Sequence, residues 1–428
     1  MLVEFRVKNF RSFQEEQVLS MVASADRSLS ENTTPASALG KRKVLRSAVV
    51  YGANAAGKSN LLKAVRFARH FILTGTDKRP DAHIAVQPFR FDHSSREAVS
   101  EFEFTFIHEE VRYQYGFTVD QQRVHEEWLF AYPKKHPQKW FERSPAASGS
   151  GSEWYFGSQL KGEKMKLVPL TRDNVLFLSV AANFAHKQLS KVYNWFSQHL
   201  WVVDADDSSD FLVQLTAQQV MANELSYTSV KDFIELADLG IIDFSLEERA
   251  QEELARDFPE ELRPLTRTNR QYDIHLHHRA KNAHSRGIPL ALTDESHGTR
   301  RIFGLGAPWL KALQAGITLF VDELDSSIHS ILVRELISMF HDAKLNREGA
   351  QLIFNTQDVS LLDLSLFRRD QIWLVKKDQT GASILYPLLD FSPRKDESLE
   401  NGYLQGRYGA IPFIDDILKR NLRSHGKT

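Results

Sequence analysis

The sequence contains no cysteine. Disulfide bridges, thiolate zinc sites and cysteine nucleophiles are therefore excluded, and the composition suits a reducing compartment such as the cytoplasm. No apolar run approaches the roughly 18 residues of a membrane-spanning helix, and charged residues interrupt the first 13 residues. The net charge is also small, since 54 Lys and Arg stand against 55 Asp and Glu. We therefore predict a cytoplasmic protein without a signal peptide, a membrane span or a bulk attraction for nucleic acid.

What the sequence does contain is an ordinary globular composition, with 42% hydrophobic and 25% charged residues over 428 positions. Alternating runs such as "EFEFTFI" and "VRYQYGFTV" predict an antiparallel meander, and "VLRSAVVYGA" and "NVLFLSVAAN" predict buried strands. Residues 185–268 are mostly of helical pattern. We expect an α/β fold whose mixed sheet is formed by residues 1–184 and 269–428, with an antiparallel β layer and a helical insertion at 185–268.

"GANAAGKS", at positions 52–59, matches a phosphate-binding loop (P-loop) at every fixed position, between a predicted strand and a predicted helix. Its glycines allow the backbone to turn tightly, and its amides and the start of the helix favour an anion. We expect the ammonium of Lys58 to contact the terminal phosphates and the hydroxyl of Ser59 to bind Mg²⁺. The residues predicted to bind ATP here are Gly52, Asn54, Ala55, Ala56, Gly57, Lys58, Ser59 and Asn60.

Two adjacent acids end the apolar run "ITLFVDE". Asp322 is the predicted metal ligand, directly or through water. Glu323, at the carboxyl end of the predicted strand, is the predicted general base for an attacking water. Two carboxylates are needed because one neutralises the metal while the other stays free to accept a proton. We call these two residues the acid pair.

"ESHGTRR", at positions 295–301, begins a predicted helix with Ser and Gly, which present a hydroxyl and amides to an anion. This signature segment resembles the signature motif of ABC-type ATPases of the RecF and SMC branch, where it precedes the acid pair, as here. The resemblance implies that Ser296, Gly298 and Thr299 complete the nucleotide site of a second subunit in a head-to-tail, ATP-dependent dimer.

Further segments resemble the same branch. "LDSSIH" with Asp325 resembles the D-loop at the dimer interface, and "NFRSF" resembles an N-terminal motif whose arginine, here Arg11, approaches the nucleotide. "FLSVAAN" lies where the branch has its glutamine loop, which implies that Asn183 senses metal or water. Gln357 replaces the usual switch histidine. Its amide can donate to a phosphate but cannot become cationic, so we expect slow turnover.

The C-terminal blocks "RRDQIWLVKKDQTGASILYPLLDF" and "GYLQGRYGAIPFI" resemble a bacterial ATPase family of defence loci, which includes RloA-type ATPases and ATPase components of abortive-infection systems. The resemblance implies an ATPase that responds to a trigger, such as DNA or a phage protein, and controls a separate effector nuclease or toxin.

Two other classes remain as alternatives: a RecF-like DNA-repair ATPase, for which a strongly basic face would be diagnostic, and a transporter motor, which would require a membrane subunit. Three histidines in "YDIHLHHR", His275, His277 and His278, lack a carboxylate at ligand spacing, so we interpret them as part of an exposed strand rather than a metal site.

Overall fold

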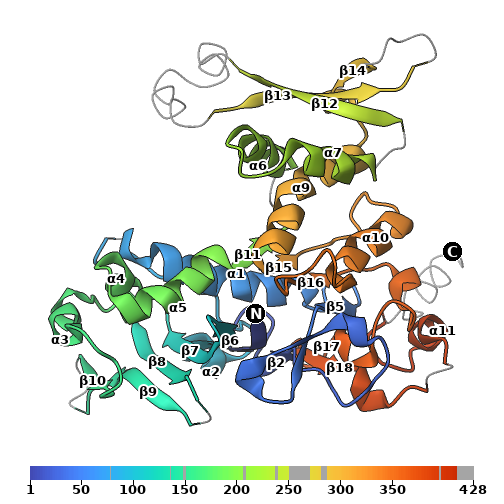
Figure 1. Ribbon diagram of the computed structural model, residues 1–428. Helices are drawn as coiled ribbons and strands as arrows, with labels where there is room; N and C mark the ends of the chain where they lie inside the picture. The colour runs from blue at the N-terminus through green and yellow to red at the C-terminus, as the bar shows by residue number, and fades with distance from the viewer. Residues whose placement is uncertain are drawn as a thin grey trace, which may run out of the picture.

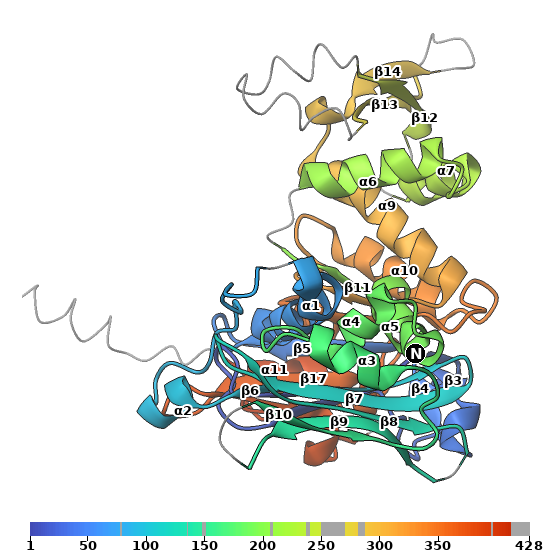
Figure 2. The same ribbon diagram turned by 90° about the vertical axis from the view of Figure 1, so that its left-hand side faces the viewer.

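The computed structural model describes residues 1–77, 79–134, 136–147, 151–205, 209–236, 240–249, 270–280, 287–394 and 397–411. The described residues form two large sheets, a small unit that projects from them, and covering helices (Figures 1 and 2). No helix in this described part of the chain is both long and apolar enough to span a membrane.

The central sheet is mostly parallel. In the described residues its strand order is β11 (Leu200–Val203), β15 (Thr318–Val321), β16 (Gln351–Asn355), β5 (Ser47–Gly52), β17 (Ile372–Lys377) and the antiparallel edge strand β18 (Ser383–Pro387). Every residue of β5, β15 and β16 is buried, which explains why these strands are continuous apolar runs rather than alternating ones. Because β15, β16, β5 and β17 are parallel, their carboxyl ends meet at one edge of the sheet.

The second sheet is antiparallel throughout. In the described residues its order is β10 (Ser152–Phe156), β9 (Gln138–Pro145), β8 (Val124–Tyr132), β7 (Val111–Val119), β6 (Ser100–His108), β1 (Leu2–Lys8) and β2 (Gln17–Ser20). This sheet confirms the predicted meander, and it pairs the N-terminal strand β1 with β6 from about a hundred residues later.

Helix α1 (Lys58–Thr74) joins the two sheets. One hydrophobic cluster contains Val50 of β5, Leu62 of α1 and Phe117 of the antiparallel sheet. Val49, the neighbour of Val50 on β5, belongs to a second cluster with α9 (His297–Ala315) and α10 (Ser330–His341). Since successive strand residues point to opposite faces, β5 is covered by α1 on one side and by α9 and α10 on the other.

The remaining short elements connect these layers. They are the α-helices α2 (His93–Glu97), α3 (Lys164–Leu167), α4 (Phe177–Asn183), α5 (Lys187–Gln198) and α11 (Leu399–Leu404), the strands β3 (Thr33–Pro35) and β4 (Lys43–Leu45), and the 3-10 turns η1 (Ser30–Asn32), η2 (Ser37–Leu39), η3 (Gly75–Asp77), η4 (Val168–Leu170), η6 (Leu292–Asp294), η7 (Val359–Leu361), η8 (Arg369–Gln371) and η9 (Leu388–Phe391).

A separate unit projects from the sheets on α9 (Figure 1). This projecting unit comprises α6 (Ser209–Met221), α7 (Tyr227–Glu235) and the antiparallel strands β12 (Ile241–Glu248), β13 (Tyr272–His278) and β14 (Ile288–Ala291). Its own hydrophobic cluster, with Val213 of α6 and Leu276 of β13, includes Phe303 and Ala307 of α9. The projecting unit is therefore packed directly onto the helix that begins with the signature segment.

A proline inside α9 fixes this docking. Pro308 has no N–H, so the carbonyl of Gly304 lacks its usual helical donor. The hydroxyl of Thr216, on α6 and fully buried, donates to that carbonyl at 3.2 Å and accepts the N–H of Ala307 at 3.0 Å. The side chain of Thr216 thus provides hydrogen-bond partners for the two backbone groups of α9 near Pro308.

The structure corrects two sequence predictions. "FLSVAAN", predicted as part of a strand, is helix α4, because the buried carboxylate of Glu127 accepts the N–H groups of Phe177 and Leu178 at its first turn. Residues 185–268 do not form one helical insertion: α5 and β11 belong to the sheet layers, and α6, α7 and β12 belong to the projecting unit with the later strands β13 and β14. Residues 250–268 of that segment lie outside the described residues.

"GRYGAIP", which the sequence left without an explanation, is a packed turn up to Ile411, its last described residue. Gly406 and Gly409 have φ angles of 77° and 76°, which favour glycine. Between them Tyr408 is buried, its hydroxyl donating to Glu397 at 2.7 Å and its carbonyl accepting from the hydroxyl of Tyr386 at 2.7 Å. The turn therefore closes the second hydrophobic cluster.

Candidate functional site

The predicted P-loop lies between β5 and α1, at the carboxyl edge of the parallel sheet. A Cβ at Gly52 would overlap the carbonyl oxygen of Val375 on β17, so the close pairing of these strands requires glycine there. Ala55 and Gly57 have φ angles of 60° and 116°, which turn the backbone around the loop. A Cβ at Gly57 would overlap the hydroxyls of Ser12 and Ser383, so the loop rests directly on two other segments of the chain.

Sequence reasoning did not predict these two serines, which support the P-loop through hydrogen bonds. Ser383 Oγ donates to the carbonyl of Ala56 at 2.5 Å and contacts Ser12 Oγ at 2.8 Å, which also accepts the side-chain amide of Asn60 at 2.8 Å. Ser12 follows Arg11, whose N–H donates to the carbonyl of Gln87 at 2.7 Å. The backbone at Arg11 is therefore close to the loop, but Arg11 is not among the described residues that line the cavity below, and its approach to a nucleotide stays a prediction.

Lys58, the first residue of α1, is buried and folds back over the loop. Its ammonium donates to the carbonyls of Gly52 at 2.7 Å and Ala53 at 3.3 Å. Burial lowers the pKa of Lys58, and the carboxylates of Glu323, Asp325 and Asp322 oppose that shift. Since these carboxylates favour the charged form, Lys58 presents an ammonium at the cavity that can contact an anion.

The acid pair follows β15 at the same edge. Asp322 is buried, and the side-chain amide of Asn355, which ends β16, donates to its carboxylate. The carbonyl oxygen of that amide accepts the N–H of Glu323 at 2.7 Å. Glu323 has a φ of 48°, a left-handed conformation that this hydrogen bond helps to hold. Asn355, which sequence reasoning missed, thus positions both acids.

The loop and one of these acids face a common cavity of about 570 Å³. It is lined by Ala53, Asn54, Ala55, Ala56, Gly57, Lys58, Ser59, Asn60, Glu323, Gln357 and Lys377. Lys377, exposed at the end of β17, was not predicted, although the position directly after a buried parallel strand is the signal that would have indicated it. Gln357 reaches the cavity from the turn after β16, and its N–H donates to Asp325 at 3.2 Å.

The signature segment begins α9 as predicted but is not among the described residues that line this cavity. Exposed Ser296 caps the helix by accepting the N–H of Thr299 at 3.1 Å, and the two hydroxyls lie 2.9 Å apart. A Cβ at Gly298 would overlap the carbonyl oxygen of Ser327, so this glycine is required for contact with the turn after the acid pair. Just before this N-terminal cap, Glu295 Oε1 lies 2.6 Å from Nε2 of His278, which belongs to the projecting unit.

The structure contradicts the prediction that Asn183 is a metal ligand. Its side-chain amide donates to the hydroxyl of Thr76 at 2.9 Å, just beyond the C-terminal end of α1. The P-loop is at the other end of this 17-residue helix, which is about 25 Å away at 1.5 Å per residue. The prediction failed because it took "FLSVAAN" as a strand ending at the nucleotide, whereas α4 runs beside the far end of α1. His275, His277 and His278 lie on β13, and no cluster of three metal-binding side chains occurs among the described residues.

The order of the parallel strands, the strand–loop–helix geometry and the acid pair define an α/β protein of the P-loop class. The chain belongs to the family described as "AAA domain, putative AbiEii toxin, Type IV TA system", whose model matches residues 47–363. No curated protein matches the chain.

Solved structures of SMC head domains also resemble it. One is an SMC head bound to the C-terminal winged-helix domain of ScpA, with 14% identity and a TM-score of 0.45 over 90% of this chain and 96% of that one. Another is an SMC head with an extended coiled coil bound to the C-terminal domain of ScpA, from Pyrococcus furiosus, with 12% identity and a TM-score of 0.40 over 91% of this chain and 97% of that one.

Proposed function

We propose that the chain binds ATP in the P-loop cavity and hydrolyses it to ADP and phosphate with Mg²⁺. The observation that carries this proposal is that Lys58, Glu323 and Gln357, from three distant segments, face one cavity with the loop amides. In the proposed complex the ammonium of Lys58 exchanges its carbonyl partners for the terminal phosphates. The exchange is favourable because an ammonium is attracted more strongly by an anionic phosphate oxygen than by a neutral carbonyl.

The donor set fits Mg²⁺, which prefers oxygen ligands and keeps several waters. Ser59 and Asp322 are the residues proposed to hold it, since the first lines the cavity and the second is a buried carboxylate already oriented by Asn355. The ion, when bound, supplies positive charge to the phosphate oxygens. Glu323, whose backbone is fixed by the same asparagine, is proposed to accept the proton of the attacking water.

Hydrolysis is proposed to require a second copy of the chain. Ser296 is exposed at the start of a 19-residue helix, and the described lining of its own chain's cavity does not include it. We propose that Ser296, Gly298 and Thr299 of one copy approach the ATP of the other, with Asp325 at the interface. Gln357 donates a neutral hydrogen bond, so slow turnover is expected.

The biological role we propose is the control of a separate effector, a nuclease or toxin, in bacterial defence by abortive infection, with DNA or a phage protein as trigger. The family description, which names a toxin and a toxin–antitoxin system, supports this role, as does the sequence resemblance to ATPases of defence loci.

The first test is binding of a non-hydrolysable ATP analogue, measured by calorimetry. Lys58→Ala removes a charged partner of the phosphates, so we expect binding to weaken about 100-fold or more, equivalent to about 3 kcal/mol. Lys41→Ala, at an exposed lysine of an N-terminal loop, is the control and should bind like the wild type. Equal affinity of Lys58→Ala and wild type would refute the assignment of the cavity.

A further inference from the structure

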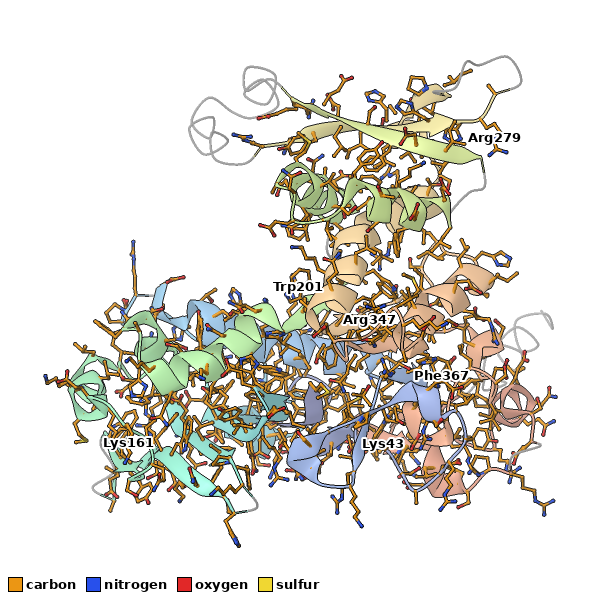
Figure 3. All side chains as sticks on the ribbon, viewed as in Figure 1. Lys43, Lys161, Trp201, Arg279, Arg347 and Phe367 are labelled. Carbon is orange, nitrogen blue, oxygen red and sulfur yellow. The ribbon has the colours of Figure 1, made fainter. Side chains whose placement is uncertain are left out.

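A second concave region lies at the opposite end of α1 from the P-loop. Two adjoining hollows of about 720 and 310 Å³ share Leu170 and Phe184 in their walls. They lie where η4 and the turn between α4 and α5 meet, on the side of the molecule where Figure 3 labels Lys161. We call this pair of hollows the distal groove.

The walls of the distal groove are apolar and partly exposed. Leu167 is buried in the larger hollow, and Val175 and Val180 line the smaller one. The shared residues Leu170 and Phe184 are 49% and 60% exposed. Large apolar side chains exposed side by side around a hollow mark a surface that loses free energy when another molecule covers it, by about 25 cal/mol per Å² of apolar area.

The turn that presents Phe184 is held in an uncommon conformation. Ala185, the next residue, has a φ of 54°, which is unfavourable for a residue with a Cβ. Hydrogen bonds from the N–H groups of Ala185 and His186 to carbonyls of α4 keep this turn closed. The backbone of the turn therefore directs the side chain of Phe184 outward, where its ring is largely exposed.

The rim of the groove carries an excess of positive charge. Lys161, Lys166 and Lys187 border the larger hollow and Arg172 the smaller one, and Glu163 is the single carboxylate in the described lining of the two. Glu163 is paired with Lys166 at 2.8 Å, which leaves the other three cations to set the local field. The whole chain has a formal charge of only −1, so this rim is a local feature.

We propose that the distal groove binds a segment of a partner protein that presents a large apolar side chain next to carboxylates. The apolar walls fit the side chain, and Lys161, Lys187 and Arg172 fit flanking Asp or Glu residues. A single-stranded nucleic acid fits less well because base stacking uses a series of aromatic platforms, and Phe184 is the sole Phe, Tyr or Trp in the described lining of either hollow. The proposal does not depend on ATP binding or hydrolysis.

The test is selection from a phage-displayed library of random 12-residue peptides on the immobilised full-length protein. We expect enrichment of peptides in which Phe, Trp or Leu is flanked by Asp or Glu. A synthetic peptide of the most enriched sequence should bind at least tenfold more weakly to the double variant Phe184→Asp, Lys187→Glu, and more weakly in 0.5 M salt, because exposed charges are then screened.

The control is Lys344→Glu combined with Leu345→Asp, which makes the same chemical changes at exposed residues of the turn after α10. It should bind the peptide like the wild type. A urea-denaturation curve of the groove variant that matches the wild type will show that it is folded.

Three outcomes would overturn the proposal: no enrichment over the groove variant, enriched peptides without carboxylates, or equal affinity for the groove variant and wild type. Binding of a 30-nucleotide single-stranded DNA that depends on Phe184 and Lys187, without peptide binding, would also overturn it and assign the groove to nucleic acid.

Discussion

The P-loop cavity and the signature segment, the two halves of the proposed ATP site, are held by different parts of the molecule. The cavity is formed by residues that follow β5, β15, β16 and β17, and all four strands lie in the central sheet. Ser296, by contrast, begins α9, which carries the projecting unit (Figure 2). The cavity is thus built on the central sheet, whereas the position of Ser296 also depends on a peripheral unit.

The contacts of each half show this difference in detail. Asn355, fully buried, holds both residues of the acid pair. Glu295, next to Ser296, is instead bonded to His278 at the end of β13. If the two halves are separable, substitutions in the central sheet should change the binding or hydrolysis of ATP. Substitutions near α9 should instead change the self-association of the chain or its coupling to hydrolysis. The predictions below test that division.

The largest expected effect is on turnover, from Glu323→Gln. Glutamine fits the same position but cannot accept a proton from water, so we expect the hydrolysis rate to fall about 10²–10⁴-fold while the ATP analogue binds normally. Glu335→Gln, at an exposed residue of α10, is the matched control and should keep wild-type activity. Phosphate release is the measurement, and undiminished release by Glu323→Gln would mean that another group is the base.

The second prediction tests whether the halves come from different copies. Ser296→Arg should keep Lys58-dependent binding but lose hydrolysis and ATP-dependent self-association, because a bulky cation replaces a small hydroxyl. Mixed with Lys58→Ala protein, it should recover a fraction of the activity, since one interface of the mixed dimer has an intact cavity and an intact signature segment.

The measurement is steady-state phosphate release against mixing ratio, with each variant alone as baseline. Absence of recovery in a mixture shown to contain heterodimers would contradict a role in trans for Ser296. A wild-type monomer whose specific activity does not depend on concentration would contradict it as well.

Local patterns in the sequence predicted the strand, loop and helix that form the P-loop cavity's main wall. "VLRSAVVYGANAAGKS" is an apolar run, a glycine loop and a helix start within 16 residues, and the structure has that arrangement in β5, the P-loop and α1. Ser12 and Ser383 were missed because each comes from a distant segment and nothing in its own neighbourhood marks it, whereas Lys377 was missed although it ends a buried parallel strand. Only the order of strands in the folded sheet brings them to the loop.

The errors have a physical cause as well. "FLSVAAN" is apolar throughout, and a short apolar run does not distinguish a buried strand from a buried helix. The choice is made by Glu127, about 50 residues earlier, whose buried carboxylate accepts N–H groups at the first turn of α4. The prediction that Asn183 binds the metal assumed that this segment is a strand, and it failed for the same reason. In the projecting unit, β13 falls in the segment that the sequence predicted as an exposed strand. The strand β12 was missed, because it lies in a segment of mostly helical pattern and pairs with β13 across residues 250–269, which the structure does not describe.

The third prediction concerns how α9 is joined to the projecting unit. Thr216→Val keeps the shape of the side chain but removes the hydroxyl that serves Gly304 and Ala307, leaving buried backbone groups without a partner. We expect the free energy of unfolding to fall by about 2 kcal/mol. Thr216→Ser, which retains the hydroxyl, is the control.

Urea denaturation measures the stability of these variants, and calorimetry with the ATP analogue should show unchanged binding, since the cavity belongs to the core half. Equal stability of Thr216→Val and wild type would mean that the docking of α6 on α9 does not rely on this hydroxyl. A loss of analogue binding would contradict the division of the site into two separate halves.

The smallest expected effect lies in the core half and depends on pH. His341, at the end of α10, is buried, and its Nε2 lies 2.8 Å from Ser47 Oγ of β5. Burial, with a smaller contribution from the charge of Arg46, lowers the pKa of His341 from 6.5 to about 3. Between these values the unfolded chain binds a proton that the folded chain does not, so the stability contributed by neutral His341 is lost as pH falls below about 6.5.

From pH 7.5 to 5.5 this histidine alone should reduce the free energy of unfolding by about 1.4 kcal/mol, which is about one pKa unit of proton uptake. His341→Gln cannot take up the proton, so its stability should fall less steeply over the same interval, whatever its stability at pH 7.5. His93→Gln, at an exposed histidine of α2, is the control and should keep the wild-type slope. Urea denaturation at several pH values gives the slopes, and identical slopes for His341→Gln and wild type would show that His341 is accessible to protons in the folded core.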